Sequence, residues 1–305
     1  MNAHTPRNVA ASVRQRLLNR TRETGEDFNL ILTRYAVERL LFRLSQSKHR
    51  SAFILKGAML FEVWIKRPHR PTRDLDLTGY GGDSAEEVAA AFREIVGVPV
   101  QPDGLQFDPG GIAVSDIPED QEFHGKRVVI PATLGTARIN IQADVGFGDV
   151  VSPSVQEIAF PTLLDLPAPR IRAYPPEAVI AEKLHAMVAL GVRNSRMKDF
   201  YDILAMSREF CFEGAPLAAA VAATFERRGT PLPSSTPIAL TGEFGSDPDK
   251  ATQWRAFLRR NQLAPPVPGF AEAVREISRF LSPVIRSARA GRAFSAVWKP
   301  GAPWQ

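Results

Sequence analysis

The stretch of residues 53–78 constrains the fold of this chain more than any other part of the sequence. Three apolar residues at 53–55 are typical of a buried strand, and the apolar positions at 59–64 suit a helix packed on a sheet. A basic loop broken by proline follows at 66–71, after which charged and apolar residues alternate over 73–77. This order predicts a strand, a helix, a return loop and a second strand of the same sheet.

Two carboxylates lie on the second predicted strand. Because strand side chains alternate, Asp74 and Asp76 share one face, opposite the leucines between and after them. Their separation, roughly 6–7 Å by strand rise, suits a two-metal site, in which the metals lie about 3.5–4 Å apart. An Asp-x-Asp pair by itself is more often a solvated strand face or a turn, so the surrounding sequence has to support the metal interpretation.

Gly57 supplies that support, because it follows the first predicted strand and precedes the helix. Backbone N–H groups and the dipole at such a helix start favour phosphate. A single glycine after a strand usually only permits a tight turn. A phosphate cradle and a carboxylate strand at this spacing together predict a nucleotide site.

Two segments of this stretch resemble a known family. They read LKGAMLF and RPTRDLDL, and they resemble the opening motif of minimal nucleotidyltransferases of the polymerase-β-like superfamily. More closely, they resemble the AbiEii/AbiGii-type toxin nucleotidyltransferases, which include the MenT toxins. That superfamily usually has Gly-Ser where this chain has Gly57-Ala58, so a serine hydroxyl contact to phosphate is absent. We expect Lys56 to compensate in part.

Composition sets the class of the protein. The chain has 305 residues, 44% hydrophobic and 23% charged, which excludes a disordered chain and allows one large or two modest domains. The net charge of +5 permits a nucleic-acid partner without requiring one. Cys211 is the single cysteine, so no internal disulfide can form, which indicates a reduced, cytoplasmic protein. No apolar run approaches the roughly 20 residues of a membrane span, and the basic N-terminus lacks the apolar core of a signal peptide.

Helical spacing predicts two N-terminal helices at 8–22 and 29–46, which we expect to cover the sheet. In the second helix the spacing predicts that Arg34, Glu38 and Arg39 face outward. Ser84 and the acidic residues after it indicate the start of a further helix, which we expect to lead back to the sheet.

Two further strands, 126–132 and 136–145, are predicted after Gly104. Apolar and polar residues alternate along the second of these strands, with Asp144 at the end of its polar face. The family resemblance implies a third metal-binding carboxylate here. A charged residue at a strand end before a turn is the ordinary alternative, and Asp149 is a competitor for the same role.

Lys183 falls on the apolar face of a helix that is predicted to begin at Pro175. An ammonium on an inward face must find an anion, because an unpaired buried charge is very costly. A salt bridge or a snorkelling stem would satisfy it. The resemblance favours a nucleotide triphosphate instead.

The run Lys198-Asp199-x-x-Asp202 resembles the Lys-Asp-x-x-Asp signature of the toxin family. Residues three apart share a helical face, so the two aspartates lie together. The resemblance implies that Lys183 binds the nucleotide phosphates, that Asp199 is an essential acid, and that Lys198 and Asp202 lie at the nucleotide. Asp202 could orient a neighbouring cation instead, and such a run by itself is usually a solvated helix face.

The last part of the chain is basic, with arginines and tryptophans interspersed. Helices are predicted near 215–227, 248–262 and 269–286. Basic and aromatic surfaces can bind RNA by neutralising phosphates and stacking bases. Scattered arginines on solvated helices are the alternative. The arginines are 255, 259, 260, 286, 289 and 292, and the tryptophans are 254, 298 and 304.

These observations predict an α+β protein in three parts. Residues 1–150 form a nucleotidyltransferase-like mixed sheet flanked by helices, 151–174 a proline-punctuated linker, and 175–305 a mostly helical domain that completes the active-site cleft. The resemblance implies transfer of NMP from an NTP to RNA, with the 3′ end of tRNA as the candidate acceptor. It also implies a toxin with a separately encoded antitoxin or a role in phage defence. The rivals are a nucleotidyltransferase acting on a protein or small molecule, and a non-catalytic nucleotide- or RNA-binding module.

The predicted site has two groups of residues. Asp74, Asp76 and Asp144 would bind Mg²⁺ in a two-metal site, because magnesium prefers carboxylate and phosphate oxygens. The backbone at Gly57 and Ala58 would hold the triphosphate together with the cations of the site. Arg73 is close enough in sequence to contact phosphates, although it could simply pair with an acid. The remaining members of the phosphate-binding group are Lys56, Lys183 and Lys198.

Overall fold

The computed structural model describes residues 8–65, 69–117, 125–148, 151–263 and 266–305. The chain divides into two compact units. Unit 1 comprises Met1–Gly148 and Gln156–Ala173, and unit 2 comprises Asp149–Val155 and Tyr174–Gln305. Each unit is described by itself below.

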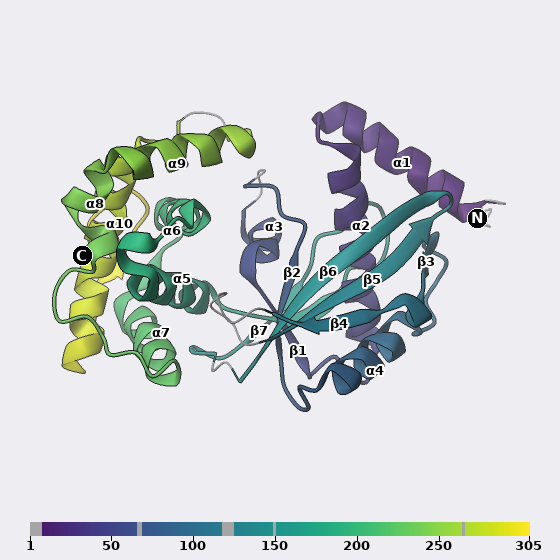
Figure 1. Cartoon of the computed structure of the whole chain (residues 1–305), viewed down its shortest axis with the longest axis horizontal. Coiled ribbons are helices and arrows are strands. Elements are labelled where there is room, and N and C mark those ends of the chain that lie inside the picture. Colours follow the sequence, from purple (N-terminus) through teal and green to yellow (C-terminus); the bar gives the residue numbers. More distant parts are fainter. Residues whose placement is uncertain (1–7, 66–68, 118–124, 149–150, 264–265) are drawn as a thin grey trace. The chain divides into compact units, whose positions relative to one another are not determined.

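Unit 1 is built on a mixed sheet, which has eight strands among the described residues (Figure 1). The path runs β3-β5-β6-β2-β1-β8-β7, with β4 paired to β5. The β2–β6 and β1–β8 pairs are parallel, and the other pairs are antiparallel. The strands are β1 (Phe53–Lys56), β2 (Leu75–Gly79), β3 (Leu105–Phe107), β4 (Ala113–Asp116), β5 (Gly125–Leu134), β6 (Ala137–Phe147), β7 (Gln156–Ala159) and β8 (Arg170–Ala173).

Helices flank this sheet, which confirms the predicted fold class. They are α1 (Val9–Thr24), α2 (Phe28–Gln46), α3 (Phe61–Trp64) and α4 (Ala85–Val96). Asn8 and Asp27 cap the first two helices through their side chains, and Ser84 forms a capping box with Glu87 at the start of α4. Helix α2 packs on β6 and β8, so its apolar residues face the sheet.

The predicted outward position of two residues of α2 is wrong. Glu38 and Arg39 are 1% and 0% exposed. Asp103, from the loop before β3, accepts hydrogen bonds from Arg39 Nε at 3.4 Å and from Arg43 Nη1 at 2.6 Å. Glu38 Oε2 accepts from the backbone N–H of Leu163 at 2.7 Å. These partners are distant in sequence, so helical spacing alone could not indicate them.

The sequence pattern assigned residues 151–174 to a linker, whereas the structure places the strands β7 and β8 within this range, in the sheet of unit 1. Prolines 161, 167 and 169 lie between these two strands and not within them. A proline between strands interrupts no ladder hydrogen bond, and for this reason punctuation by proline did not reveal the strands.

Unit 2 is mostly helical, with one short antiparallel pair of strands. Helix α10 packs on α6, α7 and α8 through an apolar face that includes Phe280 and Ile277. The helices predicted near 215–227, 248–262 and 269–286 are confirmed. The elements are α5 (Pro176–Leu190), α6 (Met197–Glu209), α7 (Gly214–Arg227), α8 (Gly242–Ser246), α9 (Pro248–Arg260) and α10 (Phe270–Ala290), with β9 (Phe212–Glu213) and β10 (Val297–Trp298).

Within the described parts of the chain, none of the helices combines the length and the apolarity that crossing a membrane requires.

Candidate active site

Gly57 lies in direct contact with the side chain of Asp76. It follows β1 with φ +72°, a conformation that favours glycine, and it opens a 3-10 turn that leads into α3. A Cβ atom at this position would lie 2.1 Å from Oδ2 of Asp76. The glycine is therefore needed twice, for its backbone conformation and for the space that the carboxylate occupies. The turn brings backbone and carboxylate together as the sequence predicts for a nucleotide site.

The sheet register places four charged residues in one row across four neighbouring strands. Lys56 on β1 is opposite Asp76 on β2, Asp76 is opposite Asp144 on β6, and Asp144 is opposite Arg127 on β5. Residues that are directly opposite in a sheet project on the same face. We call these four residues the charged row. The row brings together three residues that the sequence indicated and one, Arg127, that it did not.

Arg127 and Asp144 form a bidentate ion pair. Nε and Nη2 of Arg127 donate to the two carboxylate oxygens at 2.9 and 2.7 Å. Hydrogen bonding to Asp144 is the largest cause that raises the pKa of Arg127, although burial opposes it. The charges of Asp74 and Asp76 raise this pKa further, so both carboxylates lie within electrostatic reach of the guanidinium.

The carboxylates of unit 1 suit magnesium in chemistry, but their present placement does not assemble a metal site. Asp74 is exposed, Asp76 is half-buried, and both oxygens of Asp144 accept from Arg127. Among the described residues, no three Asp, Glu, His or Cys side chains are grouped so that they could hold a metal ion. Asp149, the competitor for the third carboxylate, lies outside the described residues.

The other predicted phosphate ligands of unit 1 differ in their exposure. Lys56 and Ala58 are buried, at 6% and 8% exposed. Arg73 is exposed, and its Nη2 lies 4.0 Å from Oδ1 of Asp27. Arg73 therefore has an acidic neighbour within its own unit, which is the simpler of the two interpretations that the sequence left open. Residues 66–68 of the basic loop lie outside the described residues.

Unit 2 brings Lys183, Asp199 and Asp202 into one cluster. Nζ of Lys183 on α5 lies 2.8 Å from Oδ1 of Asp199 and 2.8 Å from Oδ2 of Asp202, both on α6. Nε of Arg196 donates to the other oxygen of Asp199 at 2.6 Å. Both aspartates are fully buried, and Lys183 is 9% exposed. The two carboxylates therefore do not belong to a solvated helix face, while Lys198 beside them is exposed.

The charges around Asp199 keep it ionised. Burial by itself would raise the pKa of this carboxyl group, but the charges of Lys183 and Arg196 outweigh burial and lower it. A salt bridge, one of the answers that the sequence left open for Lys183, is what the structure contains. The side chain of Lys183 is 11% exposed, so this residue lies at the edge of the buried cluster.

Two residues that sequence reasoning missed fix the start of α6. Oδ1 of Asn194 accepts from the backbone N–H of Arg196 at 2.8 Å, and Nζ of Lys250 donates to the carbonyl oxygen of Asn194 at 2.7 Å. Asn194 and Lys250 are 0% and 8% exposed. Lys250 lies on α9, so no local sequence signal could have connected it with α6. The local signal was an Asn shortly before a helix, because its side chain can accept a hydrogen bond from the backbone two residues later and form a turn.

The C-terminal tryptophans are part of the core of unit 2. Trp254 and Trp298 are 1% and 2% exposed. Trp304 is half-buried and stacks on Phe280, with ring centroids 5.8 Å apart. Their indole N–H groups donate to backbone carbonyl oxygens. Trp254 and Trp298 are therefore not available for stacking with bases, and the arginines of this region remain as candidate RNA contacts.

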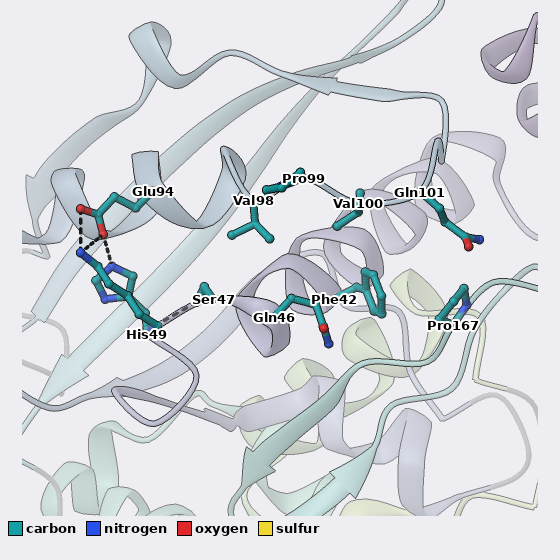
Figure 2. A pocket seen from close by; sticks show the side chains of 11 residues that line it. Phe42, Gln46, Ser47, His49, Glu94, Val98, Pro99, Val100, Gln101 and Pro167 are labelled. Carbon is teal, nitrogen blue, oxygen red and sulfur yellow. Dashed lines mark hydrogen bonds and ion pairs between the residues drawn. The ribbon is translucent and has the colours of Figure 1, made fainter.

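A cavity of about 720 Å³ in unit 1 is lined by none of the predicted site residues. Figure 2 shows it between the end of α2 and the segment after α4, with Phe42 and Val98 among its apolar side chains. His49 Nε2 lies 2.6 Å from a carboxylate oxygen of Glu94 at its rim. Residues 47–49 precede β1, whereas Gly57 follows it, so the cavity lies toward the opposite end of that strand.

Comparisons with known proteins agree with the sequence motifs. The family model described as "Nucleotidyl transferase AbiEii toxin, Type IV TA system" matches residues 39–276. The structure is similar to that of MenT4, a nucleotidyltransferase toxin of Mycobacterium tuberculosis, with a TM-score of 0.52 and 16% identity over 93% of this chain and 99% of that one. It also matches JHP933 of Helicobacter pylori, with a TM-score of 0.47 and 12% identity over 83% and 90% of the two chains. A search of curated proteins finds no match.

Proposed function

The chain belongs to the AbiEii family of nucleotidyltransferase toxins of type IV toxin–antitoxin systems, and from this premise we propose that it transfers NMP from an NTP to an RNA acceptor. It is a nucleotidyltransferase, and its family implies a separately encoded antitoxin. The proposal concerns the donor, the metal, the acceptor and the residues that act on them. We further propose that the acceptor is a tRNA 3′ end, which would place the reaction in the cytoplasm, and that the system can serve in phage defence.

The observation that carries the proposal is the contact between Gly57 and Asp76, which is a member of the charged row. A carboxylate packed against a glycine at a helix start offers anionic oxygens for a cation beside backbone N–H groups for phosphate. Asp74, Asp76 and Asp144 would hold Mg²⁺, which when bound supplies charge neutralisation of the triphosphate and activation of the acceptor hydroxyl. The backbone of Gly57 and Ala58 orients the phosphates.

Unit 2 contains a second group of cationic side chains. Its cluster pairs Lys183 and Arg196 with the carboxylates Asp199 and Asp202. The exposed Lys198 beside the cluster adds a further positive charge. The buried aspartates hold Lys183 in a fixed position at the edge of the cluster. We propose that its ammonium contacts the triphosphate while Asp199 and Asp202 keep it oriented, and that Lys198 contacts phosphate from the exposed side of α6.

The surface of α10 supports a nucleic-acid acceptor. Four arginines on this helix are exposed and recur at helical spacing, which aligns them along one face. Such a row can neutralise successive phosphates. These are Arg275, Arg279, Arg286 and Arg289.

The test is incubation of the purified protein with Mg²⁺, total tRNA and each of the four α-labelled NTPs in turn. We expect label in the RNA with one or two nucleotides, and its loss in Asp76→Asn. The matched control is Asp83→Asn, which removes an exposed carboxylate outside the charged row. Label found in protein and not in RNA would mean that the acceptor is a protein. No label with any NTP or acceptor would favour a non-catalytic binding module. The absence of the serine of the family's Gly-Ser motif is the feature that supports this alternative.

A second test uses toxicity in cells. Expression of the wild-type chain should arrest growth, and Asp76→Asn should relieve the arrest at equal protein level. Arrest that persists in Asp76→Asn would contradict the assignment of this carboxylate.

A further inference from the structure

Asp144 has two neighbours that make opposite demands on it. The register of β2 and β6 places it directly beside Asp76, where a third metal carboxylate belongs. The register of β5 and β6 places it beside Arg127, which takes both of its oxygens at 2.9 and 2.7 Å. A guanidinium in a bidentate pair offsets the charge of the carboxylate and engages one lone pair on each oxygen, so the carboxylate attracts a metal less strongly. The same carboxylate cannot serve both neighbours fully at once.

The pair is placed so that it can open. The side chains of Arg127 and Asp144 are 30% and 20% exposed, so solvent and incoming ligands can reach the pair and compete with it. The guanidinium also lies within electrostatic reach of Asp74 and Asp76. It therefore adds positive charge beside three neighbouring carboxylates, at the end of the charged row opposite Lys56.

We propose that Arg127 is a resident counter-cation of the carboxylate site. It holds Asp144 in the nucleotide-free protein, releases it when nucleotide and metal arrive together, and then turns its guanidinium to the triphosphate. The exchange is chemically matched, because the planar fork of arginine pairs with carboxylate and phosphate in the same bidentate manner. The consequence is that the site binds metal weakly by itself and firmly with nucleotide. This inference rests on the proposed function, since it presumes a metal site at Asp76.

The test measures binding of Mn²⁺ by its free-ion EPR signal, without nucleotide. Arg127→Met should bind Mn²⁺ about tenfold tighter than the wild type, within the usual range of coupling between two sites. Arg127→Lys keeps the charge but loses the fork, so it should also bind tighter, by about threefold. The matched control is Lys126→Met, which removes the same charge from the same strand. Lys126 pairs with Asp116 and lies opposite Val145, on the other face of the sheet, and this variant should change Mn²⁺ affinity less than twofold.

A nucleotide measurement checks the second half of the inference. In the presence of Mg²⁺, Arg127→Met should bind a non-hydrolysable NTP analogue about tenfold more weakly than the wild type, because the guanidinium no longer contacts phosphate. Lys126→Met should bind it like the wild type. Circular dichroism establishes that each variant is folded, and Arg127→Lys keeps the test decisive if Arg127→Met does not fold.

The outcomes separate the inference from the proposed function. Asp76→Asn should abolish Mn²⁺ binding in both the wild-type and Arg127→Met backgrounds. Mn²⁺ binding that survives Asp76→Asn would remove the proposed metal site itself. Mn²⁺ binding that requires Asp76 but is no tighter in Arg127→Met than in the wild type would overturn only the role of Arg127. If Arg127→Met binds Mn²⁺ more weakly than the wild type, Arg127 merely positions Asp144.

Discussion

Two charged groups of this protein, the pair of Arg127 with Asp144 in unit 1 and the Lys183 cluster in unit 2, differ in how deeply their carboxylates are buried. In unit 1, Asp144 and Arg127 have side chains that are 20% and 30% exposed. In unit 2, Asp199 and Asp202 are fully buried around Lys183. A partly exposed pair can exchange partners with solvent or ligand, whereas a buried carboxylate that loses its cation has no replacement. The comparison indicates that the first group is built for exchange and the second for holding one cation in place.

The largest effect should come from Lys183→Met, which leaves two buried carboxylates without their shared cation. We expect a loss of about 3–5 kcal/mol in the free energy of unfolding, measured by urea denaturation. Lys198→Met is the control, because this neighbouring lysine is exposed, and it should change stability by about 0.5 kcal/mol or less. A loss of stability below about 1 kcal/mol in Lys183→Met would show that the cluster tolerates the loss of this cation as a partly exposed pair such as Arg127–Asp144 does.

The next effect concerns the glycine against Asp76. Gly57→Ala introduces a Cβ atom 2.1 Å from Oδ2 of Asp76 in a left-handed backbone conformation, so both strain and displacement of the carboxylate are expected. Gly135→Ala is matched in backbone conformation, with φ +61°, but has open space around its Cβ position. Gly57→Ala should destabilise unit 1 by about 1–3 kcal/mol more than Gly135→Ala does, which is the usual cost of overpacking. Equal losses of stability in Gly57→Ala and Gly135→Ala, measured by thermal unfolding, would mean that the carboxylate of Asp76 moves away at no cost.

Asp144→Asn should have a small effect on stability and a large one on activity. Because its pair with Arg127 is partly exposed, we expect a change of about 1 kcal/mol or less in the free energy of unfolding. Transfer of labelled nucleotide should fall about a hundredfold, in line with the loss of one charge-stabilising group from an active site. Asp116→Asn, which breaks the exposed pair with Lys126 on the same sheet, should leave transfer unchanged. Full activity in Asp144→Asn would remove this residue from the site.

The smallest effect is a pH dependence carried by His185 on α5. Burial, and then the charge of Arg228, lower the pKa of His185 from 6.5 to about 4. The unfolded chain therefore binds more protons than the folded chain between these values, so this contribution to stability is complete above pH 6.5 and is lost as pH falls toward 4. His185→Gln can keep the contact with Thr230 Oγ1, and it should show less loss of stability across this window. Identical pH profiles by urea denaturation would contradict the assignment.

Local pattern predicted the elements that carry the site, because each of them depends on residues close together in the chain. The alternation along β6 predicted buried Ile139, Ile141, Ala143 and Val145, and all four are at most 5% exposed. Gly57 and Asp76 belong to one unit of strand, helix, loop and strand, so the order of these elements implied that the two residues lie close together. For Lys183 the sequence left a salt bridge, a snorkelling stem and a phosphate open, and it did not identify Asp199 as the partner.

The sequence by itself determined the fold class, the β1–β2 unit and the family resemblance, because strand alternation, helix capping and short motifs are properties of neighbouring residues. The tertiary structure decided which charges meet. Glu38 and Arg39 of α2 became buried because Asp103 and residues 163–167 provide partners. Arg127 contacts Asp144 because the register of β5 and β6 places the two residues opposite each other. A shift of this register by a single residue would turn the Arg127 side chain to the other face of the sheet. Such pairings depend on contacts between distant segments, and no local period in a sequence records them.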